Sequence, residues 1–557
     1  MTLLCVTSLS LGVLDRQVWA STYVVYIPLD SPIYQELDTL NGLGWLDTYL
    51  NEIRPISRVE AARLTIEAEK NLANSDQTDA LAASLIHSLH RELPQEIQWL
   101  VTNNEDNLPT MVQPFERAEA QLIFSRGEQR LWRTSAIGIK GEKGLNAQEG
   151  TPLLPNNDGI PTAPGTNEVF RWAGWAGFGS FLTAYGEGAA AGPLTRSINI
   201  DHGDRLRPLG TAVVASLGNF ALSAGDEEMW WGAGHFSALM FIDNAAPFPA
   251  LRVQNIHPKL LPGFFRYLGQ CRYQLFFGRL DDDRYYAHPW IDGQILSFKP
   301  LPTFEIGFTH AILFGGAHNH NYGVSGFLGR ATGFATGNAS DGNTHSRGGL
   351  YVKFRFPSLR NLEIYQELVG NDNLTYEVPT LGHFLPFLSV SYQGGFYLPR
   401  LTADGLTELR FEYAILEPND QTHSDSLYWA YNGKVMGDAL GPNATQINLA
   451  VDRWITLQDR VGLGWHYTER VPGWGSDEQY LSSIYGTNLT KEHAAGIDLD
   501  FLHLDTAIHR DGLLARLQAQ LAVEYVDAIN YQPHNQGVRL MLSCEVSLSS
   551  DFTVKFH

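Results

Sequence analysis

From about residue 110 onward, apolar and polar residues alternate with a period of two. Near the end of the chain every second residue from Val538 to Leu548 is apolar, and most residues between them are polar. The segments 265–277, 409–415, 447–451 and 517–525 repeat this alternation. Because successive side chains of a strand point to opposite faces, the pattern predicts long β-strands with one apolar and one polar face.

Alternation alone leaves open whether lipid or a protein core covers the apolar face. Three features favour lipid. The segments run to about 10 residues or more, as tilted membrane strands require, and their polar faces carry charges of both signs, as a wet lumen would. Short turns, such as Phe356–Ser358 and Asp511–Gly512, alternate with long connections such as Gly315–Asn343. The alternative is a soluble β-propeller or large sandwich, for which no blade-length repeat is visible.

The predicted fold is therefore mainly β: a transmembrane antiparallel β-barrel formed by residues 110–557. About 450 residues, at about 25 for each strand and its connection, give about 18 strands, with 16 or 20 as alternatives. Beyond residue 20 the chain has no run of 18 apolar residues. A transmembrane helix is therefore not expected.

The N-terminal part has a helical period instead. A first helix is expected over Ser31–Gly44, and a second begins after Ser57–Glu60, which has the pattern of a capping box. A third covers Asp79–Leu93, and Pro94 ends or kinks it. Because amphipathic helices must bury one face, we expect a small helical bundle in residues 21–109 to lie at the periplasmic mouth of the barrel.

The first 20 residues are interpreted as a signal peptide. Leu3–Leu14 is a short apolar region, and Val18–Ala20 resembles a cleavage site. No Lys or Arg precedes the apolar region, which a misassigned start codon would explain. The alternative is a buried N-terminal strand or helix.

Composition narrows the range of partners. A formal net charge of −21 over 557 residues disfavours nucleic acid, because phosphate contacts need Lys and Arg. The three cysteines, Cys5, Cys271 and Cys544, lack the spacing of a zinc site, and neither a metal nor a cofactor is expected. An oxidising compartment would permit a Cys271–Cys544 bridge, but two free, buried thiols are favoured.

The stretch Gly225–Pro249 combines three acids, two tryptophans and a small-residue turn. The favoured interpretation is architectural: a strand, a turn and a re-entering strand, with Trp230 and Trp231 in an interfacial aromatic belt. A second is sugar contact, in which a ring stacks on tryptophan while a carboxylate accepts from hydroxyl groups. A glycosidase would need two facing carboxylates about 5–9 Å apart, with the partner drawn from Asp281–Asp283.

Two other clusters are interpreted as solvated. Histidines 310, 318, 320 and 345 lie in or beside a Gly/Asn-rich region, and their spacing is too unspecific to predict a metal site. The triplet Asp281–Asp283 is expected to form a solvated turn rather than a calcium site. The chain contains neither a Gly-x-Ser-x-Gly elbow nor a P-loop.

Several segments, in order, resemble the capsule assembly Wzi family. They are VVYIPLDSPIYQELDTLNGLG with RPISRVEAARL, then GNFALSAGDEEMWWGAGHFSALMFIDNAAPFPALRV, then FFGRLDDDRYYAHPWIDGQILSFKPLPTFEIGFTHAILFGG. The resemblance implies a barrel of about 18 strands in the outer membrane of a Gram-negative bacterium, with a helical bundle at its periplasmic mouth. It also implies a lectin-like role in holding capsular polysaccharide at the cell surface, without catalysis.

We therefore predict a non-catalytic, lectin-like outer-membrane protein of capsule assembly. It is expected to be a monomer that contacts outer-membrane lipid and retains capsular or other surface polysaccharide. A porin for small solutes and a surface glycoside hydrolase are the alternatives, since all three share a barrel with a polar interior. The expected polysaccharide contacts are Glu228, Trp230, Trp231, Asp283, Arg284 and Trp429.

The charge bears on which polymer is held. An acidic polysaccharide would need a local basic patch or bridging cations, whereas the chain is strongly acidic. A neutral or cation-bridged polymer suits this charge better. The cations expected to face the lumen are Arg266, Arg272, Arg284, Lys353 and Arg355.

Overall fold

A computed structural model describes most of the chain beyond the expected signal peptide. The residues that it describes are 22–76, 78–103, 108–131, 148–160, 162–192, 206–282, 284, 286–319, 326, 329, 344–371, 390–417, 422–423, 427–472, 487–506 and 513–556. The signal peptide predicted for residues 1–20 lies outside them, as do the expected contact residue Asp283, His320 and the turn Asp511–Gly512.

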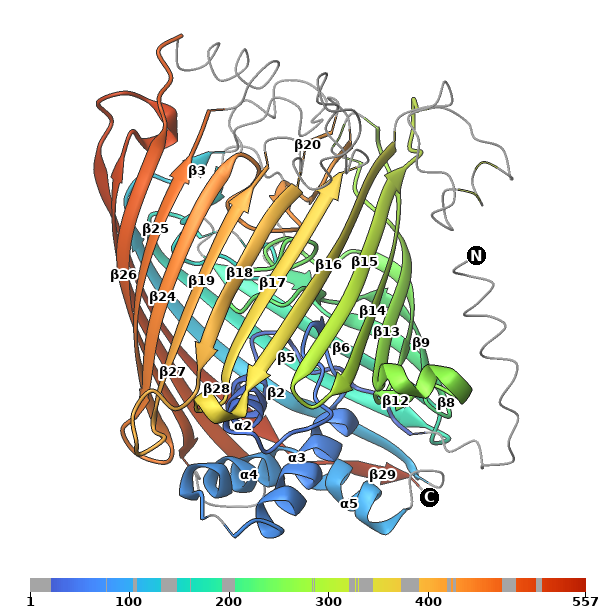
Figure 1. Ribbon diagram of the computed structural model, residues 1–557. Helices are drawn as coiled ribbons and strands as arrows, with labels where there is room; N and C mark the ends of the chain where they lie inside the picture. The colour runs from blue at the N-terminus through green and yellow to red at the C-terminus, as the bar shows by residue number, and fades with distance from the viewer. Residues whose placement is uncertain are drawn as a thin grey trace.

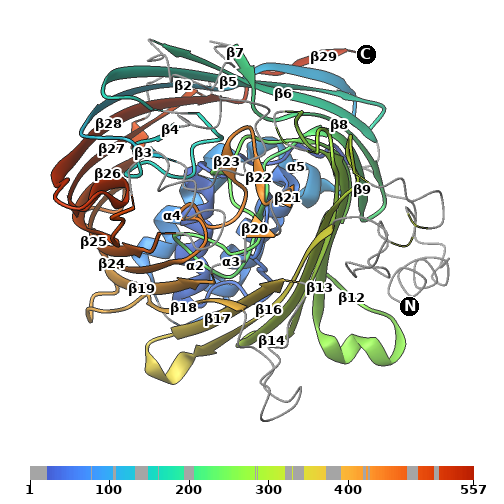
Figure 2. The ribbon, with the colours of Figure 1, turned by 90° about the horizontal axis from the view of Figure 1, so that it is seen from above.

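The described residues form a closed antiparallel barrel of 18 strands, which confirms the predicted fold (Figures 1 and 2). The first strand, β2, closes the barrel by pairing with both the second strand and the last. The strands are β2 (Thr110–Arg126), β5 (Gly165–Phe178), β6 (Leu182–Gly192), β8 (Thr211–Leu217), β9 (Phe220–Asp226), β11 (Pro249–Asn255), β13 (Gln270–Arg279), β14 (Trp290–Leu301), β15 (Phe304–Phe314), β16 (Thr344–Phe356), β17 (Leu362–Asn371), β18 (Val390–Leu398), β19 (Thr407–Leu416), β24 (Ala444–Trp454), β25 (Asp459–Arg470), β26 (Glu492–Thr506), β27 (Leu513–Asp527) and β28 (Gly537–Ser550).

Short strands supplement the wall. They are β7 (Leu206–Pro208) on β6, β12 (Lys259–Leu260) on β13 and β29 (Val554–Phe556) on β2. Four further two-stranded pairs lie outside the wall sheet: β1 (Ile53–Arg54) with β10 (Trp230–Trp231), β3 (Arg130–Leu131) with β4 (Gln148–Gly150), β20 (Thr422–His423) with β21 (Leu427–Tyr428), and β22 (Ala430–Tyr431) with β23 (Lys434–Val435).

The two faces of the wall follow the predicted alternation. Outward positions such as Leu463, Val538 and Leu542 are apolar and exposed, whereas inward positions on β19, such as Glu408 and Glu412, are charged and buried. One expectation is wrong. Phe265 and Tyr267 do not begin a strand, because Gly263–Leu268 forms a 3-10 helix, η3, and the strand begins at Gln270.

Four helices gather at one end of the barrel (Figure 1): α2 (Pro32–Leu43), α3 (Arg58–Ala73), α4 (Ala80–Glu92) and α5 (Pro94–Thr102). The predicted cap at Ser57 holds, since its side chain accepts a hydrogen bond from the Glu60 amide at 3.1 Å. Asp79, expected only as the start of the third helix, also caps it by accepting from the Ala82 amide at 3.0 Å. Pro94 ends α4 and also begins α5, because proline is well accommodated at the first helical position. None of the helices in this part of the chain has the length and apolar character needed to cross a membrane.

Three segments fold into the lumen, and we call them together the plug: residues 22–57, residues 227–248 between β9 and β11, and residues 427–443 between β19 and β24. Figure 2 shows β20–β23 and the helices inside the ring of strands. The first two segments pair directly, with Ile53 opposite Trp231. The second and third share an aromatic cluster that includes Phe241 and Trp429. Inward-facing charges are therefore buried by protein.

The two described cysteines are far apart in the wall. Cys271 is buried on β13 and Cys544 is exposed on β28, and both are free. The alternative of a bridge between them is therefore wrong. So is the expectation that both thiols are buried, because Cys544 lies on the outward face of its strand.

Candidate functional site

The acidic part of the Gly225–Pro249 stretch is internal to the protein. Glu227 accepts hydrogen bonds from the Tyr185 and Ser223 hydroxyls, both at 2.6 Å. Glu228 accepts from the Leu29 amide at 2.6 Å, which joins this loop to the N-terminal segment. Burial, reinforced by the negative charge of Asp158, raises the pKa of Glu228 well above its usual range.

The tryptophans of this stretch also lie in the plug. Trp231 is 0% exposed, donates to the Gln274 side chain, and lies with its ring centroid 5.1 Å from that of Phe241 and 5.2 Å from that of Phe276. Trp230 is buried beside it. The interfacial-belt interpretation is therefore wrong, because both rings pack against protein inside the barrel.

Trp429 and Arg284 join the third plug segment to its surroundings. The buried Trp429 indole donates to the Met240 carbonyl at 2.8 Å, and the Arg347 guanidinium lies 5.0 Å from its ring centroid. Arg284 donates to the carbonyls of Tyr428 and Ala430. It also pairs with Asp281 at 3.0 Å. Asp281 was expected to lie in a solvated turn. It instead helps to attach the plug to the wall.

Four of the five cations expected in the lumen are inside the barrel, and each contacts protein acceptors. Arg272 donates to the Leu50 and Pro55 carbonyls, both at 3.3 Å. Lys353 pairs with Glu52 at 2.5 Å, and Arg355 pairs with Glu363 at 3.2 Å. The fourth is Arg284. The expectation fails for Arg266, which is exposed in η3 on the outside of the wall.

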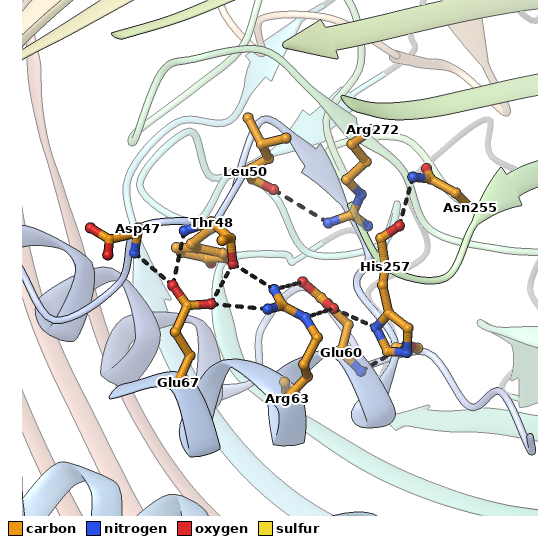
Figure 3. Close-up of polar contacts among 12 residues, drawn as sticks. Asp47, Thr48, Leu50, Glu60, Arg63, Glu67, Asn255, His257 and Arg272 are labelled. Atoms are coloured by element: carbon orange, nitrogen blue, oxygen red, sulfur yellow. Dashed lines mark hydrogen bonds and ion pairs between the residues drawn. The ribbon is translucent and has the colours of Figure 1, made fainter. Parts of the chain in front are cut away.

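A polar network fastens the helices to the wall (Figure 3). Glu60 on α3 contacts His257, which follows β11, with 2.6 Å between Oε2 and Nδ1, and Arg63 pairs with Glu60 at 2.7 Å. Glu67 accepts from the Thr48 amide at 3.0 Å. Burial would raise the pKa of Glu60, but the charge of Arg63 and the hydrogen bonds from Arg63 and His257 outweigh it and lower the pKa to about 2.

The described histidines of this group differ, since His318 is exposed, as expected, whereas the other two contact protein side chains. His345 is buried, with its ring centroid 5.7 Å from that of Trp429, so the expectation that it is solvated is wrong. His310 lies 3.1 Å from the Ser346 hydroxyl through Nε2. Within the described ranges no group of three or more His, Cys, Asp or Glu residues is arranged to hold a metal ion.

A polar cavity of about 240 Å³ lies between strands β24–β28 and a cover formed by the plug and by residues 152–155 of the connection between β4 and β5. The cavity has room for many water molecules, since each needs only about 10–15 Å³ of such volume. Most charges in its lining are paired: Arg470 with Glu492 at 3.0 Å, and Arg539 with Glu524 at 2.9 Å. We call this space the wall cavity.

Three further groups line the wall cavity. Asp498 and Asp500 lie two residues apart on one face of β26, and Gln520 on β27 is directly opposite Asp500. Neither carboxylate forms an ion pair with another residue of the described part of the chain. Sequence reasoning missed this pair, although the period-two pattern of residues 497–501 places both aspartates on one face.

The chemistry of these groups suits hydroxyl-rich ligands. Carboxylates accept from hydroxyl groups, and an amide both donates and accepts. Two carboxylates on one strand lie side by side and do not flank a bond from opposite faces, as glycosidase carboxylates do.

An 18-stranded closed barrel with an apolar outer face and a polar interior defines an outer-membrane protein of a Gram-negative bacterium. The chain belongs to the capsule assembly protein Wzi family, whose pattern it matches over residues 138–536. The predicted family, fold and location are thereby confirmed.

Two relatives support this assignment. The solved structure of Wzi from Escherichia coli, an outer-membrane protein involved in group 1 capsule assembly and described as a carbohydrate-binding β-barrel, aligns with a TM-score of 0.64 at 16% identity, over 96% of this chain and 99% of that one. An uncharacterized 55.8 kDa protein from the cps region of Klebsiella pneumoniae is 24% identical over 189 residues. That match covers 33% of this chain and 37%, little more than a third, of the Klebsiella protein.

Proposed function

We propose that this protein retains polysaccharide at the cell surface without cleaving it. The observation that carries the proposal is the plug, which fills the lumen with three interlocked segments. A porin needs a continuous water path, whereas here the Trp231 and Trp429 rings occupy the interior. The likeness to an E. coli protein described as a carbohydrate-binding β-barrel supports the same interpretation.

In this proposal the helices face the periplasm, and residues 21–109 both cover that mouth and contribute to the plug, while residues 110–557 form the barrel. One end of the wall cavity then lies toward the cell surface. Trp454 and Leu502 pack against the helices at one end of β24 and β26. The cavity extends from the other end of these strands, where Gln446 and Glu492 lie, to Asp500, which is two residues from Leu502.

The proposed ligand is a neutral or cation-bridged polysaccharide, and the proposed contacts are Asp498, Asp500 and Gln520. The predicted lumen cations already contact acceptors of the protein. Their charges and donors are therefore not available to bind a polyanion. Five of the contacts expected from sequence are buried and hold the plug in position, and the plug lines the cavity on the side opposite the strands. They are Glu228, Trp230, Trp231, Arg284 and Trp429. Whether any of them, or Asp283, touches the polymer stays a prediction.

The test is deletion of the gene in a strain that makes surface polysaccharide, followed by separate measurement of cell-bound and released polymer. Retention predicts more polymer in the medium at unchanged total synthesis, together with negligible conductance of the purified protein in planar bilayers. Large steady conductance with unchanged cell-bound polymer would establish the porin instead. Shortened chains that depend on Asp498 or Asp500 would indicate a hydrolase.

A variant pair then tests the wall cavity. The double change Asp498→Asn and Asp500→Asn should release polymer nearly as the deletion does while the barrel still shows heat-modifiable gel mobility. The matched control is Asp551→Asn, the same chemical change at an exposed residue beside the helices. If the double variant retains polymer like the control, the cavity is not the site, and the deletion phenotype still decides retention.

A further inference from the structure

The connection between β11 and β13 departs from its neighbours at the helix-bearing end of the barrel. The next turn along, between β8 and β9, has only Gly218 and Asn219 between paired residues. The β11–β13 connection instead contains β12 and η3, and Figure 2 shows it projecting outward from the wall. We call residues Lys259–Leu268 the outer loop.

The outer loop exposes a cluster of aromatic residues. Phe264 is 80% exposed and Tyr267 67%, with Phe265 and Leu260 also exposed, and η3 has no buried residue. The rings pack on one another: the centroid of Phe264 lies 6.2 Å from that of Phe265 and 5.9 Å from that of Tyr267, whose ring also lies 5.1 Å from the Arg266 guanidinium. Exposing such apolar area to water costs about 25 cal/mol per Å². We therefore expect another apolar surface to cover the aromatic cluster.

The outer loop is held firmly where it leaves the wall. Gly269 has φ +75°, and a side chain there would overlap the backbone carbonyl of Lys299 on β14. Lys259 and Leu260 pair with Cys271 and Gln270 on β13. The aromatic cluster is therefore presented at a fixed position beside the wall.

Two observations identify what covers it. The first is continuity: Leu217, Phe220 and Leu301, at neighbouring strand ends, are apolar and exposed on the outward side of a barrel that lies in a membrane. The second is charge. The loop carries Lys259 and Arg266, and residues 256–270 contain no Asp or Glu, although the chain as a whole has a net charge of −21. Aromatic rings with adjacent cations are typical of the lipid headgroup level.

We propose that the outer loop is a lipid anchor that inserts into the interfacial zone of the bilayer leaflet on the helix-bearing side. Phe264, Phe265 and Tyr267 lie at the boundary between headgroups and acyl chains. Arg266 and Lys259 contact anionic phospholipid headgroups. The lipid contact of this barrel thus extends beyond its wall, and the proposal does not depend on polysaccharide retention.

Depth-dependent fluorescence quenching tests the insertion. The full chain, with its three cysteines replaced by alanine, carries one bimane label on a new cysteine at Phe264, Leu463 or Asn74 and is reconstituted in lipid vesicles. The Leu463 label, on the outer wall, should be quenched by lipids brominated deep in the acyl chain, and the Asn74 label, at the end of α3, by aqueous iodide. The Phe264 label should resist iodide and be quenched most by lipids brominated near the headgroup.

Two outcomes would overturn the anchor. In one, the Phe264 label behaves like the Asn74 label, which places the loop in water. In the other, the label is protected from iodide in detergent as the protein concentration rises, which would show that a second copy of the chain covers the loop.

The charged part is tested separately with the Phe264 label and two brominated lipids, phosphatidylglycerol and phosphatidylcholine. A cation near the surface enriches anionic lipid by about fivefold at low salt. Arg266→Glu should therefore reduce the preference for phosphatidylglycerol at least by this factor. Lys491→Glu, an exposed charge reversal near the other end of the barrel, should leave it unchanged. Equal preference in both variants would overturn the headgroup contact.

Discussion

Replacing Trp231 with alanine is predicted to open the lumen while leaving the barrel intact. Trp231 joins two plug segments to the wall: its backbone pairs with Ile53 of the N-terminal segment, its ring contacts Phe241 of its own segment, and its indole donates to Gln274 of the wall. Trp231→Ala removes the ring contacts and the donor together. No wall strand contains Trp231, so the ladder of the barrel stays unchanged.

The magnitude follows from burial. Truncating a large buried aromatic side chain to alanine costs about 3–5 kcal/mol. That cost falls on the plugged state, because Trp231 packs within the plug. At about 1.4 kcal/mol for each factor of ten, the population with a loosened plug should rise by about 10² to 4 × 10³. A state too rare to see in the parent protein would then be frequent.

The assay is single-channel conductance in planar bilayers, combined with limited proteolysis of the plug in detergent. Trp231→Ala should show frequent current steps and faster cleavage within residues 227–248. The matched control is Trp465→Ala, which truncates a tryptophan that is 42% exposed on the outer wall. If Trp231→Ala is as silent and as protease-resistant as this control while both barrels remain heat-modifiable, Trp231 does not hold the lumen closed.

Three further predictions concern the attachments of the helices and plug. Ser57→Ala removes an N-cap and should lower the free energy of unfolding of the helical segment by about 1 kcal/mol in thermal melts; an unchanged melt would contradict the cap. Because the pKa of Glu60 is lowered to about 2, its interactions should stabilise fully above its unfolded-state value, about 4.5, and be lost as the pH falls toward 2. Glu60→Gln should therefore flatten the melting temperature against pH in that window, and an identical slope in both proteins would refute the linkage. Lys353→Met leaves buried carboxylates unpaired and should destabilise by about 3–5 kcal/mol, against about 1 kcal/mol or less for the exposed pair broken by Lys491→Met; equal losses of heat resistance would show that the Lys353 network is not a stability element.

The fold was predictable because its signals are local. Alternation within a strand needs only neighbouring residues, and the cap at Ser57 is decided within three residues. Segment 265–268 was mispredicted because its aromatic spacing imitates a strand, although Pro262 and Gly263 before it are residues typical of a turn.

The site was harder to predict because it depends on contacts between distant segments. Trp231 faces Ile53, 178 residues earlier, and Trp429 donates to Met240, 189 residues earlier. The sequence pattern around an aromatic loop residue is the same whether the loop stays at the rim of the barrel or folds into the lumen. The sequence therefore could not distinguish tryptophans of an interfacial belt from tryptophans of a plug. The wall cavity has the same origin: the Asp498 and Asp500 pattern is visible, but the cover over it comes from the plug and from residues 152–155, which are distant in sequence.

The Trp-Gly-x-Gly motif of residues 231–234 is explained by packing. A side chain at Gly232 would come within 2.6 Å of Ala238, and one at Gly234 would overlap the carbonyl oxygen of Ser237. Next to them, the Ala233 amide donates to Glu367 of the wall at 3.1 Å and the His235 amide donates to Glu412 at 2.7 Å. The glycines let the loop turn back on itself while its amides reach carboxylates on the inner wall. The motif is thus a means of fixing the plug inside the barrel.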